Sequence, residues 1–110
     1  MERIYNKLVR DKIPEIIISK GEKPITKILN IKDFKLELEK KLKEECQEVI
    51  DATGKERIEE LADVLEILCA LAKLENSNLE EVICIADHKA EKRGAFDKKI
   101  FLQKVICQNK

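Results

Sequence analysis

Apolar residues recur every three or four positions along two long stretches of this chain, and this spacing predicts two amphipathic helices. The stretches cover roughly residues 32–52 and 55–75, and Thr53-Gly54 between them is a turn signal. Asn30 or Asp33 would cap the first helix, because their side-chain oxygens can accept hydrogen bonds from its free backbone N–H groups. A connection this short predicts two antiparallel helices that pack side by side.

Two shorter helices are expected on either side of this pair. Residues 8–20 predict a short helix or helix-like arm, with Pro14 near its start and Gly21 after its end. A third helix of the main body is expected over about residues 78–92, where Asn78 and Glu81 form a capping-box pattern.

Two further segments have the pattern of extended chain. Residues 24–29 read PITKIL; the segment is rich in β-branched residues and its apolar positions alternate, which predicts a short strand. Residues 99–106 are also expected to be extended. Both segments are minor. The expected fold class is therefore all-α, an antiparallel helical hairpin plus a third helix, in a single domain over residues 1–110 with residues 1–20 as an N-terminal arm.

Acidic residues interrupt the apolar surface of the helix expected over residues 55–75. At about 100° per residue, one apolar face of this helix consists of Ile58, Leu61, Ala62, Leu65, Leu68 and Ala72. A second apolar sector consists of Ile67, Ala70, Leu71 and Leu74. Glu60 and Asp63 open this second sector, and their i, i+3 spacing makes their side chains neighbours.

The helix expected over residues 32–52 has the same feature. Its predicted buried side consists of Phe34, Leu38, Leu42, Cys46 and Val49. Glu45 lies within this sector and Glu48 lies at its edge, whereas Glu44 points further round toward water. Antiparallel packing would then bring Glu45 and Glu48 opposite Glu60 and Asp63, across about 8–10 Å between the helix axes.

Four carboxylates in one small volume need compensation. Two like charges about 4 Å apart repel by roughly 4 kcal/mol at an effective dielectric constant near 20, which a small domain cannot carry several times over. Protonation, lysine side chains that reach in, or a divalent cation would each relieve this repulsion. An all-oxygen ligand set suits Mg²⁺, Mn²⁺ or Ca²⁺. Glutamates on helices are also often simply solvated, and this is the ordinary interpretation of the other acids.

Charge and composition exclude several classes of partner. The 22 basic and 22 acidic residues cancel, aromatic residues make up 4% and tryptophan is absent, so a nucleic-acid polymer is not an expected partner. The four cysteines have no metal-binding spacing and are expected to be free thiols. No apolar run is long enough for a membrane span and no signal peptide is evident, so a cytoplasmic location is expected.

Three motifs resemble one enzyme family. The sequence EECQE, residues 44–48, followed by EELAD, residues 59–63, matches the ExxE…ExxD signature of the MazG-like, all-α nucleoside triphosphate pyrophosphohydrolases. Residues 86–96, ADHKAEKRGAF, resemble the family's K-x-x-K/R-G-x-F segment. Residues 5–17, YNKLVRDKIPEII, are similar to the N-terminal arm of a small single-domain branch that is often labelled as similar to phosphoribosyl-ATP pyrophosphohydrolase.

The resemblance implies a MazG-like helical bundle in which Glu45, Glu48, Glu60 and Asp63 hold Mg²⁺, with Mn²⁺ as a substitute. Glu44 would bind a second ion or orient water, and Glu45 or Glu48 would take the proton of the attacking water. Family members usually cleave a nucleoside triphosphate between its α- and β-phosphates, releasing a monophosphate and pyrophosphate. They usually assemble as homodimers or homotetramers.

Basic residues are expected to bind the substrate phosphates. They are Lys89, Lys92 and Arg93 at the end of the third helix, and Lys7 and Arg10 in the arm. The alternatives are an interaction of the first three with the helix dipole, and plain docking of the arm onto the bundle. Phe96 would either stack on a base or anchor the turn.

Three functions remain open from the sequence. The first is a Mg²⁺-dependent nucleoside triphosphate pyrophosphohydrolase that cleans or limits the nucleotide pool. The second is the phosphoribosyl-ATP pyrophosphohydrolase of histidine biosynthesis. The third is a non-catalytic, oligomeric helical module in which the acids pair with lysines across a subunit interface.

Overall fold

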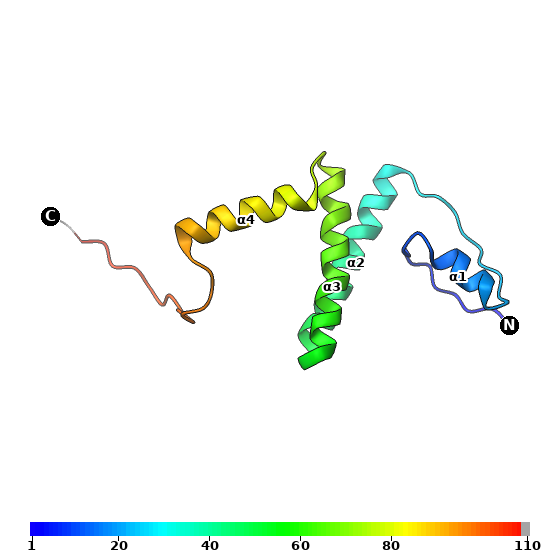
Figure 1. Cartoon of the computed structure of the whole chain (residues 1–110), viewed down its shortest axis with the longest axis horizontal. Coiled ribbons are helices and arrows are strands. Elements are labelled where there is room, and N and C mark those ends of the chain that lie inside the picture. Colours follow the sequence, from blue (N-terminus) through cyan, green and yellow to red (C-terminus); the bar gives the residue numbers. More distant parts are fainter. Residues whose placement is uncertain (109–110) are drawn as a thin grey trace. The chain divides into compact units, whose positions relative to one another are not determined.

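The computed structural model describes residues 1–108, and this part of the chain contains four helices and no strand (Figure 1). The helices are α1 (Ile13–Ser19), α2 (Ile31–Asp51), α3 (Gly54–Leu74) and α4 (Leu79–Arg93). The predicted all-α class, with a helical hairpin and a further helix, is confirmed. The chain divides into one unit that runs from Met1 to Asn78 and another that begins at Leu79. Each unit is described by itself.

Both ends of α2 are fixed by side chains. The Asp33 backbone N–H donates to Asn30 Oδ1 over 2.8 Å, so Asn30 is the N-cap. At the other end, Arg57 Nε donates to the carbonyl oxygens of Val49, over 3.1 Å, and Ala52, over 2.8 Å. These carbonyls lie at the helix end, where no intrahelical donor is available, so Arg57 ties the start of α3 to the end of α2.

The reversal between α2 and α3 takes only two residues. Gly54 has a φ of +58°, a left-handed conformation that is costly for residues with a Cβ atom. It lets α3 begin directly after Ala52 and Thr53. The two helices therefore pack against each other as the predicted hairpin.

The acid-bearing sector of α3 is the one that faces α2. In this sector Ile67 is buried, and Ala70, Leu71 and Leu74 are half-buried; Leu38 is the buried residue of α2. The other apolar face of α3 is mostly not covered within the first unit: Ala72 is buried, but Ile58, Leu61, Leu65 and Leu68 are 37–66% exposed. Cys46, predicted on the buried side of α2, is exposed. The first unit by itself thus has a thin core and an uncovered apolar face.

The short helix expected over residues 8–20 is confirmed with narrower bounds, Ile13–Ser19, because Pro14 fits only the first turn of a helix. The strand expected over residues 24–29 is wrong. Residues 24–29 and 99–106 lack strand structure. A strand needs a hydrogen-bonded neighbour, and no ladder forms within the described part of the chain; Ile25 and Ile28 are 85% and 97% exposed.

The second unit consists of α4 and the segment that follows it. No residue of α4 is buried, and the apolar side chains Val82, Ile83 and Ile85 are 40–49% exposed. Among the residues described, no helix combines the length and apolar character that a membrane span requires.

Candidate metal centre

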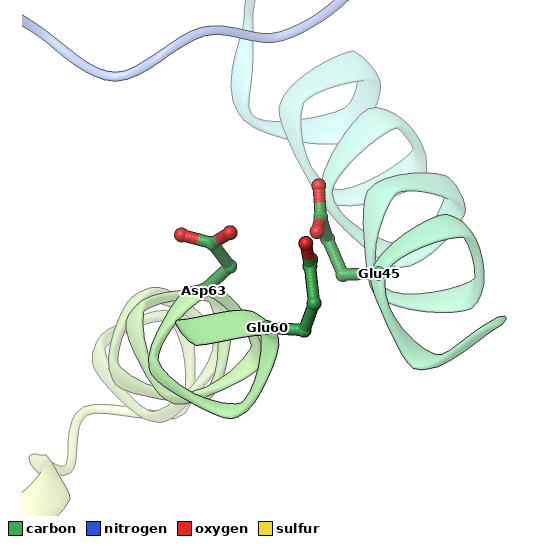
Figure 2. Close-up of side chains that lie close together, drawn as sticks. All are labelled: Glu45, Glu60 and Asp63. Carbon is green, nitrogen blue, oxygen red and sulfur yellow. The ribbon is translucent and has the colours of Figure 1, made fainter. Parts of the chain in front are cut away.

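Three carboxylates meet between α2 and α3. Glu45 extends from α2, and Glu60 and Asp63 extend from successive turns of α3 (Figure 2). One oxygen atom of each side chain can be chosen such that all three atoms lie within 4.8 Å of one another. The helical projection from the sequence selected these three residues, and the hairpin brings them together.

Two of these side chains hold an oxygen atom away from water. Oε2 of Glu45 and Oε2 of Glu60 are buried, and neither has a hydrogen-bond partner. A buried carboxylate oxygen without a donor loses its hydration and gains nothing in return. These two atoms are therefore the strongest local indication that a cation belongs here.

The pKa values of both glutamates are raised. For Glu45 the main cause is burial, followed by hydrogen bonding and charge repulsion with Glu48, while the cation of Lys41 at 3.8 Å partly opposes the rise in pKa. For Glu60 hydrogen bonding with Glu48 raises the pKa most, followed by burial and the negative charges nearby. A protonated carboxyl can donate to Glu48 in this way, whereas an ionised one cannot. The local charge is thus only partly compensated by the protein itself.

Glu48 lies at the margin of the cluster. Its side chain is exposed, and it is not part of the three-residue group, yet it is close enough to perturb both Glu45 and Glu60. This agrees with its predicted place at the edge of the buried sector of α2. Its role as a fourth metal ligand stays a prediction.

Arg10 of the N-terminal arm contacts the cluster directly. Its Nη2 donates to Oδ1 of Asp63 over 2.8 Å. The resemblance assigns Arg10 to substrate phosphate, and no sequence signal indicates that it pairs with a predicted metal ligand 53 positions away. The ion pair between Lys41 and Glu45 was also missed, although their i, i+4 spacing is a signal for it.

Lys7 and Glu44 lie together outside the three-residue cluster. Both line a small cavity between the arm and α2, whose other lining residues are Asn6, Leu8, Glu37, Lys40 and Lys41. Glu44 is half-buried there and is not one of the three clustered carboxylates. A role for Glu44 with a second ion or a water molecule stays a prediction.

The other predicted phosphate ligands belong to the second unit. Lys89, Lys92 and Arg93 are exposed residues in the last two turns of α4. Gly94, at a φ of +81°, ends this helix, and Phe96 beyond it is 96% exposed. Phe96 therefore does not anchor the turn by burial within its own unit, and the roles of these four residues at the site stay predictions.

A comparison with known families agrees with the geometry. The model of the MazG nucleotide pyrophosphohydrolase domain matches residues 35–99, which is more than half of the chain. The chain belongs to the MazG nucleotide pyrophosphohydrolase family. Comparisons with curated proteins and with solved structures found no match.

The MazG match contains all the clustered carboxylates and the basic end of α4. It leaves out the N-terminal arm, including Lys7 and Arg10. The donor set fits a divalent cation of the kind that this family uses, because hard carboxylate oxygens are the ligands that Mg²⁺ and Mn²⁺ prefer. The cluster lies between two helices that one short turn holds together, so its ligands are carried on regular elements.

Proposed function

We propose that this MazG family member is a Mg²⁺-dependent nucleoside triphosphate pyrophosphohydrolase. It would cleave its substrate between the α- and β-phosphates and release a nucleoside monophosphate and pyrophosphate, and so limit unwanted nucleotides in the cytoplasm. The observation that carries the proposal is the carboxylate cluster with two buried, unpartnered oxygens, inside the region that matches the family.

Glu45, Glu60 and Asp63 would hold the cation, and Glu48 would complete the site from its edge. Mn²⁺ would serve in place of Mg²⁺, because both prefer oxygen ligands. When bound, such a cation screens the charge of the phosphates and favours ionisation of a coordinated water molecule.

Glu48 is the best candidate for the general base. Glu48 is exposed, so one of its oxygens could accept the proton of the attacking water while the other completes the metal site. Glu45 is the alternative base. Glu44, further along the same helix, would orient that water or bind a second ion.

Cationic side chains would hold the triphosphate. The guanidinium of Arg93 suits the fork geometry of a phosphate group, and Lys89 and Lys92 would act as point charges. Arg10 of the arm pairs with Asp63 of the cluster, and Lys7 lines a cavity with Glu44; both cations would contact the same phosphates. Phe96 is free to stack on the base.

The active protein would be a homodimer or homotetramer. The core of the first unit contains only three buried apolar residues, Leu38, Ile67 and Ala72. The face of α3 formed by Ile58, Leu61, Leu65 and Leu68 remains open, and a second copy would cover it.

The non-catalytic alternative requires that the protein's own cations neutralise the acids. Lys41 approaches Oε1 of Glu45 and Arg10 binds Oδ1 of Asp63, which favours this alternative. However, Oε2 of Glu45 and Oε2 of Glu60 keep no partner. The remaining demand for positive charge supports a metal site.

Product analysis tests the proposed reaction. The protein is incubated with Mg²⁺ and a panel of ribonucleoside and deoxyribonucleoside triphosphates, modified nucleotides and phosphoribosyl-ATP. We expect a monophosphate and pyrophosphate in equal amounts. Preference for phosphoribosyl-ATP would support the histidine-pathway alternative, whereas release of orthophosphate, or no cleavage at all, would contradict the proposal.

Glu60→Gln keeps the shape of the side chain and removes its charge. We expect it to lower kcat/KM by about 100-fold or more, since loss of groups that only support metal ligands already costs about 10–100-fold. Glu59→Gln is the matched control, because Glu59 is the preceding, exposed acid of α3 and lies outside the cluster. Equal activity of the two variants would count against the site.

A further inference from the structure

The N-terminal arm supplies a positive charge to the carboxylate cluster. Arg10 Nη2 lies 2.8 Å from Asp63 Oδ1, and Asp63 is one of the three residues whose oxygens converge. The Arg10 guanidinium thus forms an ion pair with Asp63, one of the candidate metal ligands. The family match includes Asp63 and does not extend to Arg10, so the matched domain supplies only one side of this contact.

The guanidinium neutralises this site only in part. It reaches Asp63 alone, while the buried Oε2 atoms of Glu45 and Glu60 keep no partner. The pair is also accessible, with the side chains of Arg10 and Asp63 exposed by 56% and 46%, and ion pairs this exposed contribute little to stability. A doubly charged cation that engages all three carboxylates would have the stronger attraction and would repel the adjacent guanidinium.

This contact is also what ties the arm to the hairpin electrostatically. Within the described residues, it is the one ion pair that joins residues 1–20 to α2 or α3. The other ion pair of the arm, between Arg3 and Glu22 at 2.7 Å, closes within the N-terminal segment, and α1 makes no packing contact with another helix. Loss of the Arg10–Asp63 pair would remove this link and loosen the arm, which would still meet α2 where Asn6, Lys7 and Leu8 line a small cavity.

We propose that Arg10 is a built-in counter-ion for Asp63, which a divalent cation displaces when it binds, and that this displacement releases the N-terminal arm. The inference rests on the proposed function only in requiring that the cluster binds a cation. The inference couples metal binding to the position of the arm: when the metal is bound, the Arg10 guanidinium no longer pairs with Asp63.

Metal affinity tests the competition directly. Mg²⁺ alone is titrated calorimetrically into the wild-type protein, Arg10→Gln and Arg3→Gln. Arg3→Gln is the matched control, because it removes the same charge from the same arm at a side chain that pairs with Glu22. We expect Arg10→Gln to bind Mg²⁺ about two- to fivefold more tightly than the wild type, because the cation no longer has to break a weak, exposed ion pair. Arg3→Gln should bind Mg²⁺ with the affinity of the wild type.

The opposite sign would overturn the proposal. If Arg10 instead orients Asp63 as a ligand, Arg10→Gln weakens Mg²⁺ binding, and if the contact is incidental the affinity does not change. Both results would leave the pyrophosphohydrolase proposal standing. Failure of the wild type itself to bind Mg²⁺ would defeat both proposals.

Tyrosine fluorescence provides a second readout that needs no activity. Tyr5 is the single tyrosine of a chain without tryptophan, and it lies in the arm, so its fluorescence anisotropy reports on arm motion once the oligomeric state is shown to be the same with and without Mg²⁺. We expect saturating Mg²⁺ to lower the anisotropy of the wild type, and Arg10→Gln to show the lower value before Mg²⁺ is added. An anisotropy that Mg²⁺ leaves unchanged in the wild type would contradict release of the arm.

Discussion

At the scale of the residue, the central feature is a local conflict between charge and burial. Glu45 and Glu60 each hold one oxygen out of contact with water or any donor, and their pKa values are raised in consequence. Folding brings these groups together, so the conflict exists only in the folded protein. Its energetic effect must therefore appear in stability as well as in activity.

The first prediction at this scale concerns pH. A carboxyl group whose pKa is higher in the folded than in the unfolded protein binds more protons when folded, so stability falls as pH rises. For Glu45 and Glu60 this contribution is fully present below the ordinary value of 4.5 and is lost as pH rises through the raised values.

Urea unfolding of the metal-free protein over this pH range would measure the effect. Glu45→Gln combined with Glu60→Gln should flatten the pH dependence in the window just above the ordinary carboxyl pKa. A dependence that this double variant leaves unchanged would show that other groups cause it.

The second prediction concerns the charge itself. Glu60→Gln should raise the Tm of the metal-free protein, because it removes a negative charge that is held near others. The same substitution should abolish the increase in Tm that Mg²⁺ gives the wild type. Thermal unfolding with and without Mg²⁺ checks both effects, and Glu59→Gln should retain the response to Mg²⁺. A destabilised Glu60→Gln that still responds to Mg²⁺ would contradict this account.

At the scale of the element, the hairpin is what converts a sequence pattern into a site. Asn30 starts α2, Arg57 binds the carbonyls at its end, and Gly54 permits the two-residue reversal into α3. The reversal sets the register in which Glu45 lies opposite Glu60 and Asp63. Errors in this register would separate the carboxylates.

The third prediction follows from the Arg57 contacts. Arg57→Ala leaves two helix-end carbonyls without their donor and should lower the free energy of unfolding by about 1–2 kcal/mol. Lys55→Ala, an exposed change in the first turn of the same helix, is the control and should have little effect. Chemical denaturation of both variants measures the difference, and equal stabilities would show that these hydrogen bonds do not hold the hairpin end.

Most of the helices and their bounds could be predicted from the sequence. Periodicity and turn residues gave the bounds of α2, α3 and α4 closely, because strong local signals agree with the packing. The strand expected at residues 24–29 failed because alternation only indicates that a segment could pair, and a partner has to exist. The pattern offered two apolar faces on α3, and the acid pairs on both helices indicated that the sector with Glu60 and Asp63 meets α2, as the structure shows.

The contact between Arg10 and Asp63 was beyond sequence reasoning for a related reason. It joins side chains 53 positions apart and depends on the path of the irregular chain around α1. No periodic pattern encodes such a path. The carboxylates themselves were selected correctly as neighbours because all three lie on regular helices of a hairpin.

At the scale of the whole molecule, the central feature is the apolar surface that the first unit leaves uncovered. The exposed apolar residues of α3 form one continuous face, which consists of Ile58, Leu61, Leu65 and Leu68. The first unit buries few apolar residues, so we do not expect it to be stable alone. Self-association through this face would give each copy the core that it lacks. Activity would then depend on assembly.

The fourth prediction tests this dependence. Leu65→Lys places a charge in the middle of the exposed face of α3 and should shift the protein to monomers with a lower Tm. Ile28→Lys is the control, because Ile28 is 97% exposed in an irregular segment. Sedimentation velocity over a range of concentrations measures the change, and an unchanged mass for Leu65→Lys would contradict assembly through this face.

The most direct test of the account is whether the carboxylate cluster binds a divalent cation. Mg²⁺ is titrated calorimetrically into the wild type, Glu60→Gln and Glu59→Gln under the same conditions. We expect saturable binding to the wild type and to Glu59→Gln, and none to Glu60→Gln. Absence of binding to the wild type, or equal binding to Glu60→Gln, would contradict the assignment of the metal centre.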